Sequence, residues 1–280
     1  MADRDRTRAR SLGFVTDDAL TRELQTLAVT TGREAAAMVL QRLGEPHETD
    51  TKASDIDIVT EVDRASEELI SHRLLAARPN DGIVGEEGTG ITSTTGIDWL
   101  VDPIDGTTSF FYGLPGFSVS IAARRDGKII AGSVIAPALS TEYTARAAAG
   151  ATLNDTPVGC RSVDGLRKAL VGTGFSPDHE RRARQGQMFA EIIPQIRDIR
   201  RMGSAALDLC AVAAGQLDAY FEIGLSEWDY AAGVLIAREA GAEVIVEPDA
   251  ATGRSFVAAA SPSISSELFA LLRSTGADKV

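Results

Sequence analysis

The stretch WLVDPIDGTT (residues 99–108) constrains the fold more than any other part of this chain. An apolar segment, WLV, runs directly into Asp102 and Asp105, which are separated by a proline and an isoleucine. Gly106 and two threonines follow at once. A surface turn can contain Asp, Pro and Gly, but it rarely needs all of them so close behind an apolar strand. The pattern therefore predicts a buried strand that ends at a functional loop.

The small residues of this loop each have a physical role. Pro103 stiffens the link between the two aspartates, so both carboxylates can face one point with little entropy left to lose. Gly106 lets the backbone approach a ligand closely. The N–H groups of Gly106 and Thr107 stand at an expected helix start, where they are free to bind a phosphate. Acids for a metal beside amides for a phosphate indicate a phosphoryl-transfer site.

Further acids stand at the ends of other expected elements. Glu86 and Glu87 follow the short apolar segment IVG, and Asp229 lies just ahead of an expected helix. Asp63 stands at the start of another helix. Because α/β proteins place ligand sites at strand ends, these acids are candidates for one shared site.

Carboxylates that converge need a counterion. At about 4 Å, one pair of like charges costs about 4 kcal/mol at an effective dielectric of 20. Oxygen ligands without His or Cys select Mg²⁺, Mn²⁺ or Ca²⁺ over zinc. The alternative is that these acids are separate helix caps and turn residues, and for any single motif that alternative is favoured. The whole set favours a metal site.

Charge and cysteine content narrow the class of protein. The net charge is −12 and the isoelectric point about 4.8, which argues against nucleic acid as the main ligand. Cys160 and Cys210 form neither a CxxC pair nor a disulfide framework. The amino terminus lacks the apolar core of a signal peptide, and no segment approaches the roughly 20 apolar residues of a membrane span. We therefore expect a soluble, cytoplasmic protein.

Apolar periodicity predicts the order of the elements. Helices are expected over residues 17–43 and 60–77. Short strands follow, and the Asp126-Gly127 turn predicts a hairpin between 117–121 and 128–135. After Gly150 the pattern becomes more α/β, with helices expected over 181–193, 204–214, 231–240 and 265–273, and strands over 169–172, 219–222, 243–246 and 256–259.

These elements predict two lobes behind a tail. Residues 1–15 are polar and aperiodic, so we expect a disordered tail. An N-terminal α+β lobe (16–150) would carry most metal ligands. A C-terminal α/β lobe (151–280) would carry substrate residues and Asp229. The boundary is expected near Gly150 to Thr156.

Several other motifs are set aside. Asp55 and Asp57 fit the DxDx[TV] motif of haloacid-dehalogenase-type phosphatases, but the preceding residues TKAS have a loop composition where a hydrophobic strand is required. There is no P-loop motif GxxxxGK[ST] and no GxSxG. The histidines lie in polar stretches away from the acids, so catalysis by histidine and a histidine-ligated zinc are poorly supported: His47, His72 and His179.

Taken together, the chain resembles the inositol monophosphatase family of Mg²⁺-dependent, lithium-sensitive phosphatases. The matching stretches are KASDIDIVTEVD (52–63), IVGEEG (83–88), WLVDPIDGTTSFFYGLPGFSVSI (99–121) and the segment 203–242, which contains WDYAAG. They appear in the order and spacing of the family, so the resemblance covers nearly everything from about residue 20 onward. One departure is Ser109, where the family often has Asn. The resemblance implies a fold of the α+β or α/β class, built as a layered αβαβα sandwich. It also implies that the protein is usually a homodimer.

The resemblance also implies a ligand set. Glu86, Asp102 and the carbonyl of Ile104 would bind a first metal. Asp102, Asp105 and Asp229 would bind a second, so that Asp102 bridges the two. Mg²⁺ is the implied ion, with two or three per site, and Mn²⁺ would substitute for it. Such ions acidify a bound water and neutralise the leaving oxygen.

Further roles are implied for residues near the reacting phosphate. Thr107 and Glu86 would position and deprotonate the attacking water, while Asp63 would orient the Thr107 hydroxyl. The amides of Gly106 and Thr107 would hold the phosphate. Ala205, Glu222 and Asp229 match positions near the inositol ring.

The expected activity is hydrolysis of inositol monophosphate, a small phosphorylated polyol. Fructose-1,6-bisphosphatase, histidinol phosphatase and phosphoadenosine phosphate phosphatase share these metal ligands and stay open as alternatives. A bisphosphate would require additional cationic side chains. Five are available in a part of the chain where no motif indicates a function: Arg181, Arg182, Arg184, Arg200 and Arg201. These arginines equally suit solvated helix faces or a dimer interface. A regulatory protein that kept the fold without the chemistry is the remaining alternative.

Overall fold

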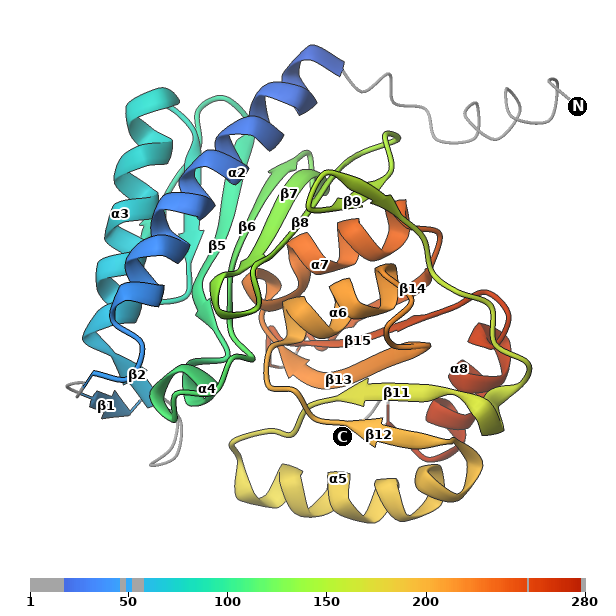
Figure 1. Cartoon of the computed structure of the whole chain (residues 1–280). Coiled ribbons are helices and arrows are strands. Elements are labelled where there is room, and N and C mark those ends of the chain that lie inside the picture. Colours follow the sequence, from blue (N-terminus) through green and yellow to red (C-terminus); the bar gives the residue numbers. More distant parts are fainter. Residues whose placement is uncertain (1–17, 46–48, 52–57, 251, 278–280) are drawn as a thin grey trace, which may run out of the picture.

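Layers of helices and sheets alternate through the molecule (Figure 1). The structure is a computed structural model that describes residues 18–45, 49–51, 58–250 and 252–277. The order of layers is helix pair, eight-stranded sheet, helix pair, five-stranded sheet and helix pair. This confirms the layered αβαβα sandwich that the family resemblance implied. Within the described residues, no helix is both long and apolar enough to cross a bilayer.

The first layer consists of α2 (Asp18–Gln41) and α3 (Glu61–Ala77). Leu24, Ala28 and Ile70 on these helices pack with Trp99 and Ile121 of the first sheet. Helix α3 begins where Thr60 accepts hydrogen bonds from the first-turn amides and donates to the Asp63 side chain. A two-stranded ribbon precedes it, formed by β1 (Thr49–Thr51) and β2 (Ile58–Thr60).

The first sheet has the strand order β10-β9-β8-β7-β6-β5-β3-β4. Only the β3–β5 pair is parallel among its described neighbours. The Asp126-Gly127 turn joins β6 to β7 with φ angles of 51° and 73°, which suits a tight hairpin. The strands are β3 (Gly82–Gly85), β4 (Gly90–Ile91), β5 (Ile97–Asp105), β6 (Ser118–Arg125), β7 (Lys128–Ala136), β8 (Thr141–Arg146), β9 (Ala151–Leu153) and β10 (Thr156–Val158).

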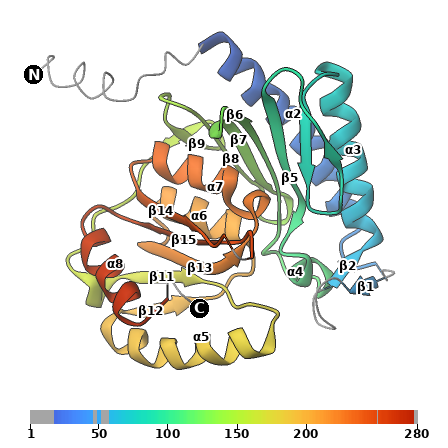
Figure 2. The ribbon, with the colours of Figure 1, turned by 180° about the vertical axis from the view of Figure 1, so that it is seen from behind.

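The central layer consists of α6 (Ala205–Ala213) and α7 (Glu227–Glu239), seen between the two sheets in Figures 1 and 2. Both helices are rich in small residues, so they approach each other closely. A Cβ added to Gly233 would lie 2.8 Å from the Cβ of Leu209. The layer packs on the first sheet through one apolar cluster and on the second sheet through another.

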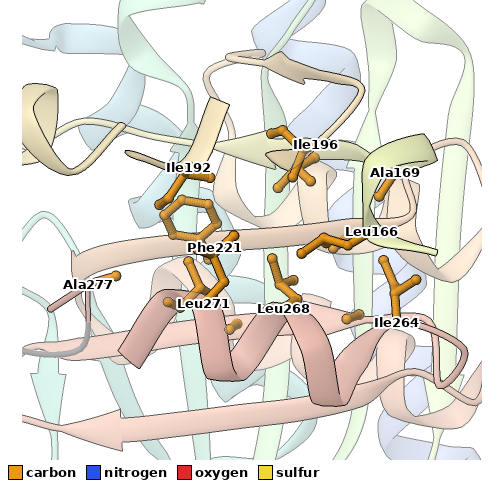
Figure 3. Close-up of a cluster of buried hydrophobic side chains, with 14 of the residues drawn as sticks. Leu166, Ala169, Ile192, Ile196, Phe221, Ile264, Leu268, Leu271 and Ala277 are labelled. Atoms are coloured by element: carbon orange, nitrogen blue, oxygen red, sulfur yellow. The ribbon is translucent and has the colours of Figure 1, made fainter. Parts of the chain in front are cut away.

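The second sheet has the order β12-β11-β13-β15-β14. Its outer face is covered by α5 (His179–Ile192) and α8 (Ser265–Ser274). Figure 3 shows the cluster between them, in which Phe221 of β13 packs against Ile192, Leu268 and Leu271. The strands are β11 (Leu170–Thr173), β12 (Asp198–Arg200), β13 (Ala219–Leu225), β14 (Glu243–Pro248) and β15 (Ser255–Ala260). Short helices complete the described elements: α4 (Thr107–Phe111), η1 (Pro137–Leu139), η2 (Leu166–Lys168) and η3 (Ile193–Gln195).

Two expectations are adjusted by the structure. The lobe boundary expected from Gly150 to Thr156 falls inside the β9–β10 hairpin, so the first sheet continues to Val158. Helix α7 begins at Glu227, so Asp229 lies within its first turn and not ahead of it. The cause is a capping interaction, because the Ser226 N–H donates to Asp229 Oδ2 at 2.7 Å. The expected tail and the set-aside Asp55 and Asp57 lie outside the described residues.

Candidate active site

A cavity of about 340 Å³ opens where the end of β5 meets the first turns of α6 and α7. Of the site residues that the sequence predicted, all but Asp63 line it: Glu86, Asp102, Ile104, Asp105, Gly106, Thr107, Ala205, Glu222 and Asp229. No His or Cys is among the described residues that line it. Residues up to 143 positions apart in the chain, from 86 to 229, are thus brought to one place.

A β-bulge sets the directions of the β5 carboxylates. Asp102 pairs with Ser120 and Asp105 pairs with Ser118, so β5 has one residue more than β6 between these points. Such an extra residue redirects neighbouring side chains. Pro103 occupies the bulge, where its missing N–H breaks no regular ladder. Both aspartates are buried, with 2% and 9% of their surface exposed, yet both line the cavity.

Glycine is required after Asp105. Gly106 has a φ of 96°, and a Cβ at this position would lie 2.7 Å from the Gly116 carbonyl oxygen. It caps the short helix α4, whose first residue is Thr107. Both residues line the cavity beside the aspartates. The backbone that the sequence assigned to phosphate binding therefore borders the same space as the carboxylates.

Asp63 lies behind the cavity wall and contacts Thr107. The Thr107 hydroxyl is 3.0 Å from Asp63 Oδ1 and 3.0 Å from the Ile104 carbonyl oxygen. Asp63 is fully buried, and Thr60 donates to its other oxygen through both its hydroxyl and its amide. Burial raises the pKa of Asp63, while these hydrogen bonds oppose the increase. Asp63 therefore fixes the Thr107 side chain without bordering the cavity.

The Asp105 carboxylate links β5 to the first turn of α6. Its Oδ2 accepts from the Ser204 hydroxyl at 2.6 Å and from the Ala206 amide at 2.7 Å. Its Oδ1 accepts only a longer bond from the Ala205 amide, at 3.3 Å. A carboxylate at a helix N-terminus is stabilised by the unsatisfied N–H groups there. No motif marks Ser204 as a site residue, since its role depends on β5 meeting α6.

The acids in the cavity raise one another's pKa values. Burial is the main cause for Asp102, Asp105 and Asp229, and the pKa of Asp105 rises to about 7. The negative charge of Glu86 adds to the increase at all three. The side chain of Glu86 lies close to Asp102 and raises the pKa of that aspartate further, while Asp105 and Asp229 add their own repulsion to it. The cluster therefore has more negative charge than its protein surroundings balance.

The donor set fits hard divalent cations. Among the described residues, no three His, Cys, Asp or Glu side chains are placed to hold a metal ion in their present positions. Burial and mutual repulsion raise the pKa values of Asp102, Asp105 and Asp229, a cation would relieve that repulsion, and Asp105 Oδ1 has lone pairs to spare. Oxygen-only donors with raised pKa values favour Mg²⁺ or Mn²⁺ once the carboxylates rotate toward the ion.

Glu67 is a supporting residue that the sequence did not single out. It is 3% exposed and accepts hydrogen bonds from the amides of Glu87 at 2.7 Å and Thr89 at 2.9 Å. A Cβ at Gly85 would lie 2.5 Å from its carboxylate carbon. Glu67 thus fixes the turn that carries Glu86. Its neighbour Glu68 is exposed, and nothing in the sequence distinguishes the two.

We expect Glu67→Gln to weaken Mg²⁺ binding at the acidic cluster by roughly 10-fold. The amide NH₂ would face a backbone N–H, and an unmade buried hydrogen bond costs about 1–3 kcal/mol. The measurement is a calorimetric binding curve for Mg²⁺. Glu68→Gln is the matched control and should leave the curve in place. An unchanged curve for Glu67→Gln, with only a lower melting temperature, would assign it a purely structural role.

Arginines also border the cavity. Of the five that the sequence proposed for a second phosphate, Arg182 and Arg201 line the cavity. Arg200 instead pairs with Asp198, and Arg181 lines a neighbouring cavity. Arg254 also lines the site, and it donates to the Gly224 carbonyl oxygen at 3.0 Å. It was missed because no motif marks it.

Comparison with known proteins identifies the family of this chain. The model of the inositol monophosphatase family matches residues 20–274. Inositol-1-monophosphatase SuhB of Mycobacterium tuberculosis is 45% identical over 257 residues, which cover 88% of this chain and 89% of that protein. Nus factor SuhB of Pseudomonas aeruginosa is 40% identical over 223 residues, covering 77% of this chain and 82% of that protein.

The likeness extends to a solved structure. Mycobacterium tuberculosis SuhB superposes with a TM-score of 0.79 at 42% identity, covering 91% of this chain and 97% of that one. The family match therefore includes β5 with its bulge, α4 and the first turns of α6 and α7, which are the elements that enclose the cavity. On the match of sequence and of fold, the chain belongs to the inositol monophosphatase family.

Proposed function

We propose that the chain is a Mg²⁺-dependent phosphomonoesterase that hydrolyses inositol monophosphate to inositol and phosphate. One observation carries the proposal. The buried carboxylates of Asp102 and Asp105 border the same cavity as Glu86, Asp229 and the amides of the Gly106 turn. Family membership supports a phosphatase, and the donor set supports a hard cation.

The same residues would hold the metal in the arrangement that the family resemblance implies. Glu86, Asp102 and the Ile104 carbonyl would bind one ion, and Asp102, Asp105 and Asp229 a second. A third, weaker ion would lie near Glu86 and Asp63. When bound, Mg²⁺ supplies positive charge that acidifies water and stabilises the charge developing on the phosphate and leaving oxygen.

The chain's own groups would orient the reactants. The Thr107 hydroxyl, fixed by Asp63 at 3.0 Å, would hold the attacking water with Glu86, which would take its proton. The amides of Gly106 and Thr107 would donate to the phosphate oxygens. These amides are part of a tight turn that only glycine fits, so they are positioned before the substrate arrives.

Two other activities are supported by particular observations. Arg182, Arg201 and Arg254 border the cavity and would suit a second anionic group, which favours a bisphosphate such as fructose 1,6-bisphosphate. The Pseudomonas aeruginosa relative is called a Nus factor, which favours a binding role for some proteins of this type. That role would be supported here if turnover were negligible while a macromolecular partner co-purified.

A substrate panel tests the proposal. With Mg²⁺ present, we expect kcat/KM for inositol 1-phosphate to exceed the values for fructose 1,6-bisphosphate, histidinol phosphate and phosphoadenosine phosphate. A higher value for the bisphosphate would favour the second activity. No turnover on any of these esters would defeat the proposal. Lithium inhibition, a homodimer and a cytoplasmic location are further parts of it that the family resemblance supports.

A further inference from the structure

The cavity contains a second acidic pair that is not part of the proposed metal site. Asp208 projects from the first turn of α6, and Glu222 lies on β13. Both line the cavity. Asp208 is 1% exposed, and its Oδ1 has no hydrogen-bond partner among the described residues. A buried polar atom without a partner is rare in folded proteins and needs an explanation.

Glu222 is rigidly positioned beside it. The Tyr220 hydroxyl donates to Glu222 Oε2 at 2.7 Å. Backbone also lies against the carboxylate of Glu222. A Cβ added to Gly174, the residue after β11, would lie 2.0 Å from Glu222 Oε2. Arg201 borders the same space, and its charge lowers the pKa of both acids against the larger, opposite effect of burial. Charges of both signs therefore face this part of the cavity.

A structural role explains Asp208 poorly. The rest of α6 is apolar, AALDLCAVA, and every one of its residues is buried. Asp218 shows how this protein satisfies a structural aspartate. Asp218 is also 1% exposed, but it accepts from Arg161 at 2.6 and 2.9 Å and from the Leu170 amide at 2.7 Å. Asp208 has no comparable set of partners within the described chain.

We propose that Asp208 is a further specificity-determining residue, which binds a hydroxyl group of the alcohol portion of the substrate beside Glu222, the residue that the family resemblance already places near the inositol ring. The inference rests on the proposed phosphatase function and deepens it by adding a residue to the site for the alcohol portion. The torsion about the Cβ–Cγ bond of an aspartate is broad, so either oxygen can turn toward a ligand. A site built to bond a hydroxyl strongly disfavours an ester that lacks it.

Two esters separate this role from the phosphatase chemistry. Inositol 1-phosphate has hydroxyls for the pair, whereas p-nitrophenyl phosphate has none. We expect Asp208→Ala to lower kcat/KM for inositol 1-phosphate by roughly 10- to 100-fold, mainly through KM. For p-nitrophenyl phosphate we expect a change of less than about 3-fold. Asp208→Asn keeps the volume and one acceptor, so its loss should be intermediate.

Asp218→Asn is the matched control, because it removes a buried charge outside the cavity and should lower stability without altering the ratio of the two esters. Inhibition of p-nitrophenyl phosphate hydrolysis by free inositol is a second measurement, and it should weaken in Asp208→Asn. Equal losses on both esters, or no loss on either, would overturn the inference. Absence of Mg²⁺-dependent hydrolysis of either ester by the unmodified protein would instead overturn the proposed function.

Discussion

Asp102→Asn is expected to abolish phosphate ester hydrolysis while leaving the fold intact. Asp102 is the residue proposed to bridge both ions, and it stands at the bulge that aims the β5 carboxylates into the cavity. Loss of metal-derived charge stabilisation is worth several kcal/mol, so kcat should fall by on the order of 1000-fold or more. Steady-state kinetics with saturating Mg²⁺ and inositol 1-phosphate would measure the loss.

The fold should survive because asparagine matches aspartate in shape. Burial and the charges of Glu86 and Asp105 raise the pKa of Asp102, so removing its charge relieves repulsion in the metal-free protein. The melting temperature without Mg²⁺ should therefore stay the same or rise. Asp98→Asn is a matched control on the same strand, since Asp98 pairs with Arg124 and does not line the cavity. Full activity in Asp102→Asn would show that the metal site is assigned to the wrong residues.

The sequence was sufficient where function depends on local backbone. The proline and glycine of the loop at 99–108 predicted a strand that ends in a close-approach turn, and β5, Gly106 and α4 have that form. The nearness of Glu86 to Asp102 was also predictable in kind. β3 and β5 are parallel neighbours with Gly85 opposite Val101, so Glu86 directly after β3 and Asp102 directly after Val101 within β5 emerge at one edge.

The sequence was insufficient where a role depends on which way a helix faces. Glu67 and Glu68 are adjacent and identical, yet only Glu67 lies against the turn that carries Glu86. Asp208 is the exception in an otherwise apolar helix, and the sequence pattern does not explain it. Its position near Glu222 depends on how α6 packs on the second sheet. Arg254 stands at the end of a loop whose path no local pattern predicts.

The start of α7 shows a third kind of difference. The apolar pattern begins at Ala231, so the helix was expected from there, but Ser226 and Asp229 cap it four residues earlier. The cap places Asp229 in the first turn, where the unsatisfied N–H groups favour a negative charge. Hydrophobic periodicity does not locate the start of a helix whose first turn is polar. In α7 that turn also carries a proposed metal ligand.

Magnesium is expected to stabilise the protein strongly at alkaline pH and weakly at acidic pH. Unlike Asp102→Asn, this prediction concerns stability, so it can be measured without any substrate. A ligand at about 100 times its Kd adds about 2.7 kcal/mol to the stability of the folded state, which is roughly 5 to 10 °C in melting temperature for a domain of this size. We expect a gain of that order at about pH 8 in millimolar Mg²⁺.

The sign of the pH dependence follows from Asp105, whose pKa rises from 3.8 to about 7 in the metal-free folded protein. Between these two values the folded state holds a proton that the unfolded state has released, so the stability of the metal-free protein falls as pH rises. Metal binding requires that proton to leave, and the affinity for Mg²⁺ therefore weakens as pH falls below about 7.

Thermal melts with and without Mg²⁺ at about pH 5.5 and pH 8 measure the difference, and NaCl of equal ionic strength controls for screening. A gain in melting temperature that is the same at both pH values, or that NaCl reproduces, would mean that the cation does not replace protons on these carboxylates. The buried acids would then be ordinary capping groups, which was the alternative for each motif taken singly.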